Sequence, residues 1–250
     1  MKEIFVAGFQ TNSFVDWPEK IASVVFLGGC NFRCYYCHNH NILSTTSNAI
    51  PFSDVLGQIK EQIGFVDGVV ITGGEPTLHP HLREIITTLR KLGLPVKLDT
   101  NGTDSDLLKE LVEKKLVDYV AMDVKAPLAR YPEIVGAPPP NEIPPFVKGV
   151  SQRDGGFSLD EIQESIEYLK KQKKVDYMFR TTLAPVLTEE DIAELGKLIK
   201  GAKCFQLQQF VPNEFSNAAK TVLLPYSITQ AQRFEQELSK HVEKVLLRGF

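Results

Sequence analysis

Apolar and amphipathic segments alternate along most of the chain. Short, mainly apolar runs predict six buried strands, at 21–27, 68–72, 95–100, 118–124, 175–182 and 204–210. Segments with apolar residues at helical spacing follow them and predict helices, at 52–63, 81–93, 104–115, near 158–172, near 188–200 and near 227–247. Strands that alternate with helices in this way predict a parallel sheet with helices packed on its outside.

We therefore expect an α/β fold, an incomplete (β/α)6 TIM-like barrel of parallel strands with a C-terminal helix. A doubly wound open sheet is the alternative architecture. The C-terminal helix carries apolar residues at helical spacing from Ile228 to Leu246, so we expect it to pack on the barrel. The length of 250 residues and the ordinary composition fit a single domain that spans 1–250.

One segment, residues 126–157, interrupts the alternation. It holds seven of the chain's 15 prolines, and proline removes backbone donors, so long regular elements are not expected there. We interpret it as a proline-rich insertion at the surface, between the fourth strand and its helix. It is either a tolerated loop or a loop that contacts a partner or gates the site.

Composition and charge limit the possible partners of the protein and its cellular compartment. The net charge of −3 gives no bulk electrostatic attraction to nucleic acid. The longest apolar run, at 21–29, is far shorter than the ~20 residues needed to cross a bilayer, and the N-terminus has no leader pattern. We expect a cytoplasmic protein without a nucleic-acid or membrane partner. In that reducing compartment, clustered cysteines bind metal or carry out chemistry more often than they form disulfides.

Three of the four cysteines lie in one loop, "GGCNFRCYYCHNH", directly after the first predicted strand, at Cys30, Cys34 and Cys37. Structural zinc needs four ligands, and His38 or Cys204 could complete such a site, but neither gives the usual paired spacing. Three thiolates in one loop suit a [4Fe–4S] cluster, in which the fourth iron stays open. We interpret Cys204 as a buried core residue.

The spacing Cys30-x3-Cys34-x2-Cys37, with Tyr36 before the last cysteine, closely resembles the signature of the radical S-adenosylmethionine (SAM) superfamily. The resemblance implies that the three cysteines are the catalytic cluster ligands and that SAM chelates the open iron. It implies reductive cleavage of SAM to a 5′-deoxyadenosyl radical. It also implies that Tyr36 lies near the adenine.

A glycine-rich stretch, "GGEPT", follows the second predicted strand. Two glycines allow backbone to approach a ligand without a side-chain clash, and an acid can face an ammonium group. The stretch resembles the superfamily's motif for the SAM amino group. That resemblance adds four residues to the expected cofactor site, Gly73, Gly74, Glu75 and Pro76.

The next two strands end in "DTNG" and "MDVK", and these stretches resemble the glycyl-radical-enzyme activases. The resemblance implies a monovalent cation beside SAM, held by the side chains of two aspartates and two main-chain carbonyls, those of Asp99, Asp123, Thr100 and Met122. It implies that Lys125 contacts the SAM carboxylate or ribose. Asp99 and Asn101 also join the expected SAM site. Arg180, at the fifth strand, resembles an activase arginine that can clamp a carboxylate.

Two positions depart from the activases. The sixth strand offers Gln206 and Gln208 where the activase of pyruvate formate-lyase has a histidine, which leaves this contact open. Residues 8–43 closely resemble the opening of activators of anaerobic ribonucleoside-triphosphate reductase. In that stretch Glu19 stands where those proteins often have glycine, and a non-glycine residue tolerates fewer backbone conformations.

These resemblances imply an activating enzyme that generates a glycyl radical on a partner enzyme. Anaerobic ribonucleotide reductase is the first expected partner, and the activase of pyruvate formate-lyase is an alternative. An electron donor such as flavodoxin or ferredoxin would reduce the cluster. A second hypothesis is a radical SAM enzyme acting on a small molecule, like 7-carboxy-7-deazaguanine synthase. A third is a non-catalytic zinc-binding module.

Overall fold

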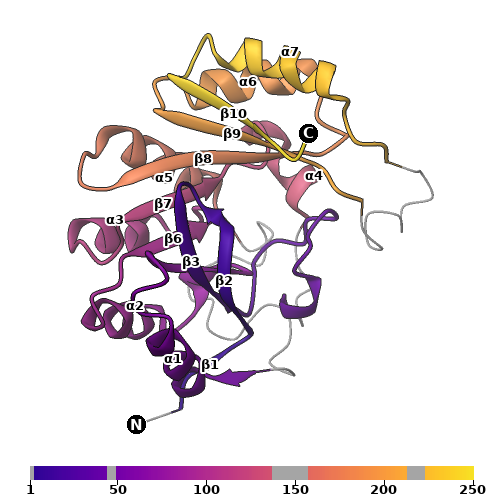
Figure 1. Cartoon of the computed structure of the whole chain (residues 1–250). Helices are drawn as coiled ribbons and strands as arrows, with labels where there is room; N and C mark the ends of the chain where they lie inside the picture. Colours follow the sequence, from indigo (N-terminus) through magenta and orange to yellow (C-terminus); the bar gives the residue numbers. More distant parts are fainter. Residues whose placement is uncertain (1–2, 44–48, 137–156, 213–222) are drawn as a thin grey trace.

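A curled, eight-stranded sheet forms the centre of the computed structural model (Figure 1), which describes all residues except 1–2, 44–48, 137–156 and 213–222. The strand order is β10-β9-β8-β7-β6-β5-β3-β2, and every neighbouring pair is parallel except β2 with β3. The strands are β2 Gly8–Trp17, β3 Lys20–Leu27, β5 Gly68–Gly73, β6 Val96–Thr100, β7 Tyr119–Asp123, β8 Asp176–Leu183, β9 Cys204–Gln209 and β10 Lys244–Arg248. The expected incomplete barrel is confirmed, because the strand order runs from β10 to β2 without closing.

Helices cover the outer side of the curl, as Figure 1 shows. They are α1 Phe52–Glu61, α2 Leu82–Lys91, α3 Ser105–Glu113, α5 Leu159–Lys171, α6 Glu189–Leu198 and α7 Ile228–Leu238. Their apolar faces pack on fully buried strand residues such as Ile71 and Leu98, which explains why the strands read as apolar runs. In the described part of the chain no helix has the length and apolar character to cross a membrane.

Two strands of the eight-stranded sheet, β2 and β10, were not expected from the sequence. β2 pairs antiparallel with β3, and its half-exposed edge position explains its mixed polar pattern. The predicted helix near 227–247 is wrong in its last part, because α7 ends at Leu238 and β10 then pairs in parallel with β9. Backbone groups on the open side of β9 thereby gain hydrogen-bond partners, which a longer helix would not provide.

Short elements surround the ends of the sheet. β1 Phe5–Val6 pairs antiparallel with β4 Ile50–Pro51, and single turns of 3-10 helix lie at η1 His40–Ile42, η2 Pro76–Leu78 and η3 Leu128–Arg130. Within the proline-rich segment the structure describes η3 and the five-residue α4 Tyr131–Val135, in keeping with the absence of long elements in that part. The remainder of that segment, residues 137–156, lies outside the described residues.

The turn between β2 and β3 shows how Glu19 replaces a glycine. Glu19 has a φ of +63°, the left-handed conformation that glycine adopts without strain. Lys115, directly after the C-cap of α3, has the same feature with a φ of +53°. The turn therefore keeps the glycine-type backbone although the residue has changed.

We expect Glu19→Gly to stabilise the folded protein by about 0.5–1 kcal/mol, because relief of left-handed strain outweighs the added freedom of the unfolded chain. Lys115→Gly is the matched variant, because Lys115 also has a positive φ, and it should stabilise the folded protein as well. Urea unfolding midpoints measure both changes. Lower midpoints in both variants would contradict a strained conformation at these positions.

Candidate functional site

The segments singled out in the sequence meet at one end of the sheet. The cysteine loop follows β3, the Gly-Gly-Glu-Pro stretch ends β5, and the two aspartate stretches end β6 and β7, with Arg180 on β8. They line a cavity of about 400 Å³. Its wall contains nearly all of the expected residues, namely Cys30, Cys34, Tyr36, Cys37, Gly73, Gly74, Glu75, Asp99, Thr100, Asn101, Asp123, Lys125 and Arg180. Pro76 and Met122 lie outside this wall.

The cysteine loop holds its sulfur atoms against the cavity with little solvent contact. Cys30 and Cys34 are each 7% exposed, and Cys37 is half-buried. The backbone N–H of Phe32 donates to Cys30 Sγ at 3.4 Å, and the N–H of Asn39 donates to Cys37 Sγ at 3.3 Å. Such N–H···S bonds stabilise thiolates and tune the potential of a bound cluster.

Burial controls the protonation of the three thiols. It raises the pKa of Cys34 to about 11, although the nearby Lys125 charge opposes the shift. Burial also raises the pKa of Cys30 and of Cys37. The metal-free thiols are therefore neutral near pH 7, and metal binding to them releases protons.

The donor set fits an iron–sulfur cluster with one open iron. Three sulfur ligands come from a single loop, whereas Cys204 begins β9 and so lies at the opposite end of the parallel sheet. Cys204 is half-buried rather than fully buried as expected. Within the described residues, no group of three or more His, Cys, Asp or Glu side chains is arranged to hold a single metal ion.

A close backbone contact also requires the two glycines of the Gly-Gly-Glu-Pro stretch, both of which line the cavity. A Cβ on Gly74 would lie 2.1 Å from the carbonyl oxygen of Gly29, and Gly73 has a φ of +127°. The N–H of Gly74 donates to the carbonyl of Leu27 at 2.9 Å, and that of Glu75 donates to Gly29 at 2.7 Å. This contact fixes the cysteine loop against the end of β5.

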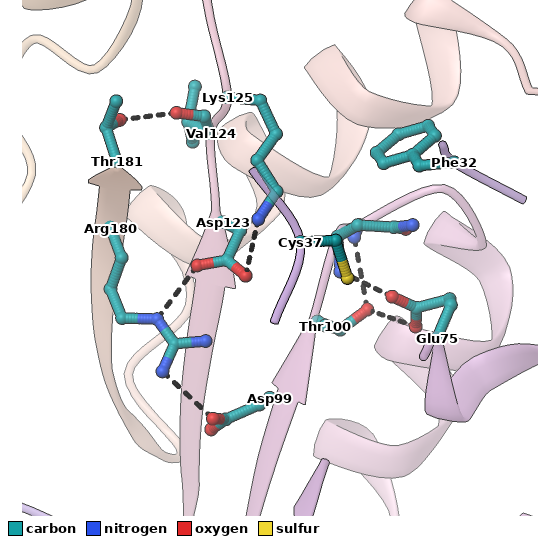
Figure 2. Close-up of polar contacts among 12 residues, drawn as sticks. Phe32, Cys37, Glu75, Asp99, Thr100, Asp123, Val124, Lys125, Arg180 and Thr181 are labelled. Atoms are coloured by element: carbon teal, nitrogen blue, oxygen red, sulfur yellow. Dashed lines mark hydrogen bonds and ion pairs between the residues drawn. The ribbon is translucent and has the colours of Figure 1, made fainter. Parts of the chain in front are cut away.

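Glu75 connects two of the loops that line the cavity. It is 1% exposed, and its Oε1 accepts bonds from the Thr77 hydroxyl at 2.6 Å and the Thr100 hydroxyl at 2.7 Å. Its Oε2 accepts from the Asn101 N–H at 2.6 Å. Burial raises the pKa of Glu75, and these hydrogen bonds oppose the shift. Figure 2 shows the Thr100 contact. The sequence interpretation did not include the role of either hydroxyl.

Side-chain amides brace the same region. Asn101 donates from Nδ2 to Oδ1 of Asn31 at 2.9 Å, which joins the cysteine loop to the end of β6. Asn39 donates to the carbonyl of Gly73 at 2.9 Å and joins the loop to β5. Asn101 was expected to contact SAM; in the structure it lines the cavity, and its amide also serves this bracing contact. Asn31 and Asn39 carried no motif signal beyond their place in the cysteine loop.

A chain of charged side chains crosses the cavity wall (Figure 2). Lys125 Nζ lies 2.9 Å from Asp123 Oδ2, and Arg180 Nε lies 2.9 Å from Asp123 Oδ1. Arg180 Nη1 lies 2.9 Å from Asp99 Oδ2, and the buried Lys97 ammonium pairs with Asp99 Oδ1. The chain therefore links three adjacent strands, β6, β7 and β8.

Three members of this chain, Asp123, Lys125 and Arg180, hold one another ionised. Burial alone would raise the pKa of Asp123, but Arg180 and Lys125 outweigh burial and lower it to about 2. Burial would lower the pKa of Lys125 and of Arg180, yet the neighbouring carboxylates raise both. Both cations consequently stay charged over the physiological pH range.

The expected monovalent-cation ligands have other contacts. All four carboxylate oxygens of Asp99 and Asp123 already face Lys or Arg groups. The other two expected ligands are the main-chain carbonyls of Thr100 and Met122, two residues that pair with each other across β6 and β7. Each carboxylate oxygen of the expected cation site therefore already has one cationic side-chain partner.

Several wall residues were not expected. Asp16 comes from β2, which was not predicted, and Thr182 follows Arg180 on β8. Of the two glutamines on β9, Gln208 lines the cavity, while Gln206 is 6% exposed and lies outside the wall.

We expect Gly74→Ala to displace the cysteine loop, because the new Cβ would clash with the carbonyl oxygen and carbon of Gly29, which are backbone atoms and cannot rotate away. Iron and sulfide bound per chain after reconstitution should fall severalfold. Gly57→Ala is the control, because Gly57 lies inside α1 and a Cβ there would meet no atom within 4 Å. This substitution should stabilise the folded protein by about 0.5–1 kcal/mol, since alanine favours the helix over glycine. Full cluster content in Gly74→Ala would disprove the close backbone contact.

Comparison with known proteins agrees with this geometry. The Radical SAM superfamily profile matches residues 24–199. A protein of Methanocaldococcus jannaschii named as a glycyl-radical enzyme activating enzyme, MJ1227, is 33% identical over 246 residues, covering 97% of this chain and 95% of that protein. The 7-carboxy-7-deazaguanine synthase of Neisseria meningitidis is 35% identical over 119 residues, 47% of this chain and 50% of the synthase.

A solved structure shows the same fold. Streptococcus suis SuiB bound to the precursor peptide SuiA superposes with a TM-score of 0.65 at 15% identity, over 89% of this chain and 48% of that chain. The matched profile covers the strands that carry the cysteine loop, the glycine turn and the charged chain. The chain belongs to the radical SAM superfamily and, within it, to the family of glycyl-radical-enzyme activating enzymes.

Proposed function

We propose that this protein generates a glycyl radical on a partner enzyme, with a [4Fe–4S] cluster on Cys30, Cys34 and Cys37 and SAM in the adjoining cavity. The observation that carries the proposal is that three thiols and a pair of basic groups, Lys125 and Arg180, line one cavity. When bound, the cluster would supply the electron for reductive cleavage of SAM. The nucleoside fragment would then remove a hydrogen atom from a glycine Cα.

The residues around the cavity suit the parts of SAM. Lys125 and Arg180 are fixed cations that suit its carboxylate, and Arg180 can offer planar N–H donors. Tyr36 is 5% exposed and gives an aromatic surface for the adenine. Gly73, Gly74 and Glu75 border the region proposed for the amino group. The cysteine thiols need a reducing compartment, so we propose that the protein works in the cytoplasm with a flavodoxin or ferredoxin as donor.

Anaerobic ribonucleotide reductase is the proposed partner, on the basis of the likeness of residues 8–43 to its activators. Pyruvate formate-lyase is the second candidate. A small-molecule reaction like that of 7-carboxy-7-deazaguanine synthase is supported less well, because that similarity spans about half of the chain, whereas the similarity to the activating enzyme runs nearly end to end.

The decisive experiment incubates reconstituted protein with SAM, a reductant and each candidate glycyl-radical enzyme. Electron paramagnetic resonance should then show a glycyl signal on the correct partner. Cys34→Ala should give no SAM cleavage and no signal, because one iron loses its ligand. A cluster-containing, active Cys34→Ala protein would refute the ligand assignment. SAM cleavage with no signal on any glycyl-radical enzyme would favour the small-molecule alternative.

We expect Asp123→Ala to weaken SAM binding by roughly tenfold, because Lys125 and Arg180 both lose the carboxylate that fixes their positions. Cluster content should not change, since the three proposed cluster ligands are cysteine thiols and Asp123 supplies none of them. Equilibrium dialysis with labelled SAM measures the SAM affinity, and iron analysis measures the cluster content. Unchanged SAM affinity would remove Asp123 from the site.

A further inference from the structure

Lys97 is a buried cation that the proposed mechanism has not used. It lies on β6 two residues before Asp99, so both side chains project from the same face of the strand. Lys97 is 1% exposed and is one of the largest fully buried side chains among the described residues. Lysine is almost never buried to this extent without a charged partner. Its partner here is Asp99 Oδ1.

Lys97 begins the chain of ion pairs that ends at the basic groups of the cavity. Asp99 joins it to Arg180, and Asp123 joins Arg180 to Lys125. The side chains of Asp99 and Asp123 supply two negative charges, and the three basic residues supply three positive charges. Asp16 adds a further carboxylate in the cavity wall, and its charge also favours the ammonium form of Lys97.

Lys97 pairs with one of the carboxylate oxygens that the expected cation site would use. Two aspartates lie on neighbouring strands at the end of the sheet, and without Lys97 the Oδ1 atom of Asp99 would be buried without its cationic partner. An unpaired buried carboxylate oxygen is costly, and alkali cations prefer such oxygen ligands. An alkali ion and the Lys97 ammonium would therefore compete for the same oxygen.

We propose that the Lys97 ammonium takes the place of the monovalent cation, acting as a positioning residue that fixes Asp99 and, through it, Arg180. This inference rests on the proposed SAM site. Burial lowers the pKa of Lys97, but the Asp99 charge opposes that shift. A covalently attached cation makes the charged chain independent of the alkali ions in solution. The oxygen ligands of Asp99 are thereby closed to metal.

The test compares potassium chloride and sodium chloride with tetramethylammonium chloride at equal ionic strength. Two quantities are measured, the SAM affinity of the cluster-reconstituted protein and the thermal unfolding midpoint without SAM. For the wild type we expect both to be the same in all three salts. A higher SAM affinity or a higher midpoint in potassium or sodium would show that an alkali ion binds natively, and would overturn the proposal.

Lys97→Met removes the charge and keeps much of the side-chain volume. In tetramethylammonium we expect its SAM affinity to fall by roughly tenfold and its midpoint to fall, with partial recovery of both in potassium or sodium, because a small cation can then reach Asp99. The exposed Lys91→Met is the control for general loss of charge and should show no salt dependence. Wild-type affinity in Lys97→Met, or a loss that no alkali ion restores, would overturn the proposal.

Two features keep the outcomes separate. If Lys97→Met does not fold, the salt response of the wild type still decides, since independence supports the built-in cation and dependence overturns it. If the wild type binds no SAM, the proposed function fails, while the unfolding midpoints measured without SAM continue to test whether Lys97 excludes alkali ions.

Discussion

The site depends on one backbone contact, the close approach of the chain after β3 to the end of β5. Gly74 lies against the carbonyl of Gly29 with no room for a Cβ, and two N–H groups at the end of β5 bond to the β3 side. The cysteine loop and the glycine turn are therefore held as one unit. The positions of the sulfur atoms relative to the rest of the cavity follow from this contact and not from the cysteines alone.

Some polar side chains in the cavity wall hold neighbouring loops together, and others face the cavity where a ligand would bind. Glu75 and Asn101 spend much of their hydrogen-bonding capacity on neighbouring loops, whereas Lys125, Arg180 and Tyr36 present charge or an aromatic surface toward the cavity. Loops alone would leave such a site loosely defined. Here each loop is tied to the next by at least one buried hydrogen bond or ion pair.

Much of the fold follows from apolar patterning, because strands buried on both faces give continuous apolar runs. This pattern made six strands predictable, and all six are present in the structure. The edge strand β2 was missed because its sequence is half polar. β10 was missed because its apolar residues also fit helical spacing. In the site, motifs identified the residues that end each strand. Lys97 and Asn31 could not be assigned a role, since a lysine inside an apolar run or an asparagine between cysteines has a role only once its partner on another loop is known.

The aromatic contacts of Phe32 have a consequence for how this protein can diverge. Phe32, inside the cysteine loop, packs against Phe157 with ring centroids 4.9 Å apart and against Tyr131 at 6.2 Å. The two ends of the segment between Tyr131 and Phe157 are therefore held close together by their contacts with the cysteine loop. Doubling the length of such a closed segment costs only about 0.6 kcal/mol in chain entropy. A change in the length of that segment therefore costs little in chain entropy as long as the two ring contacts that support the cysteine loop are kept.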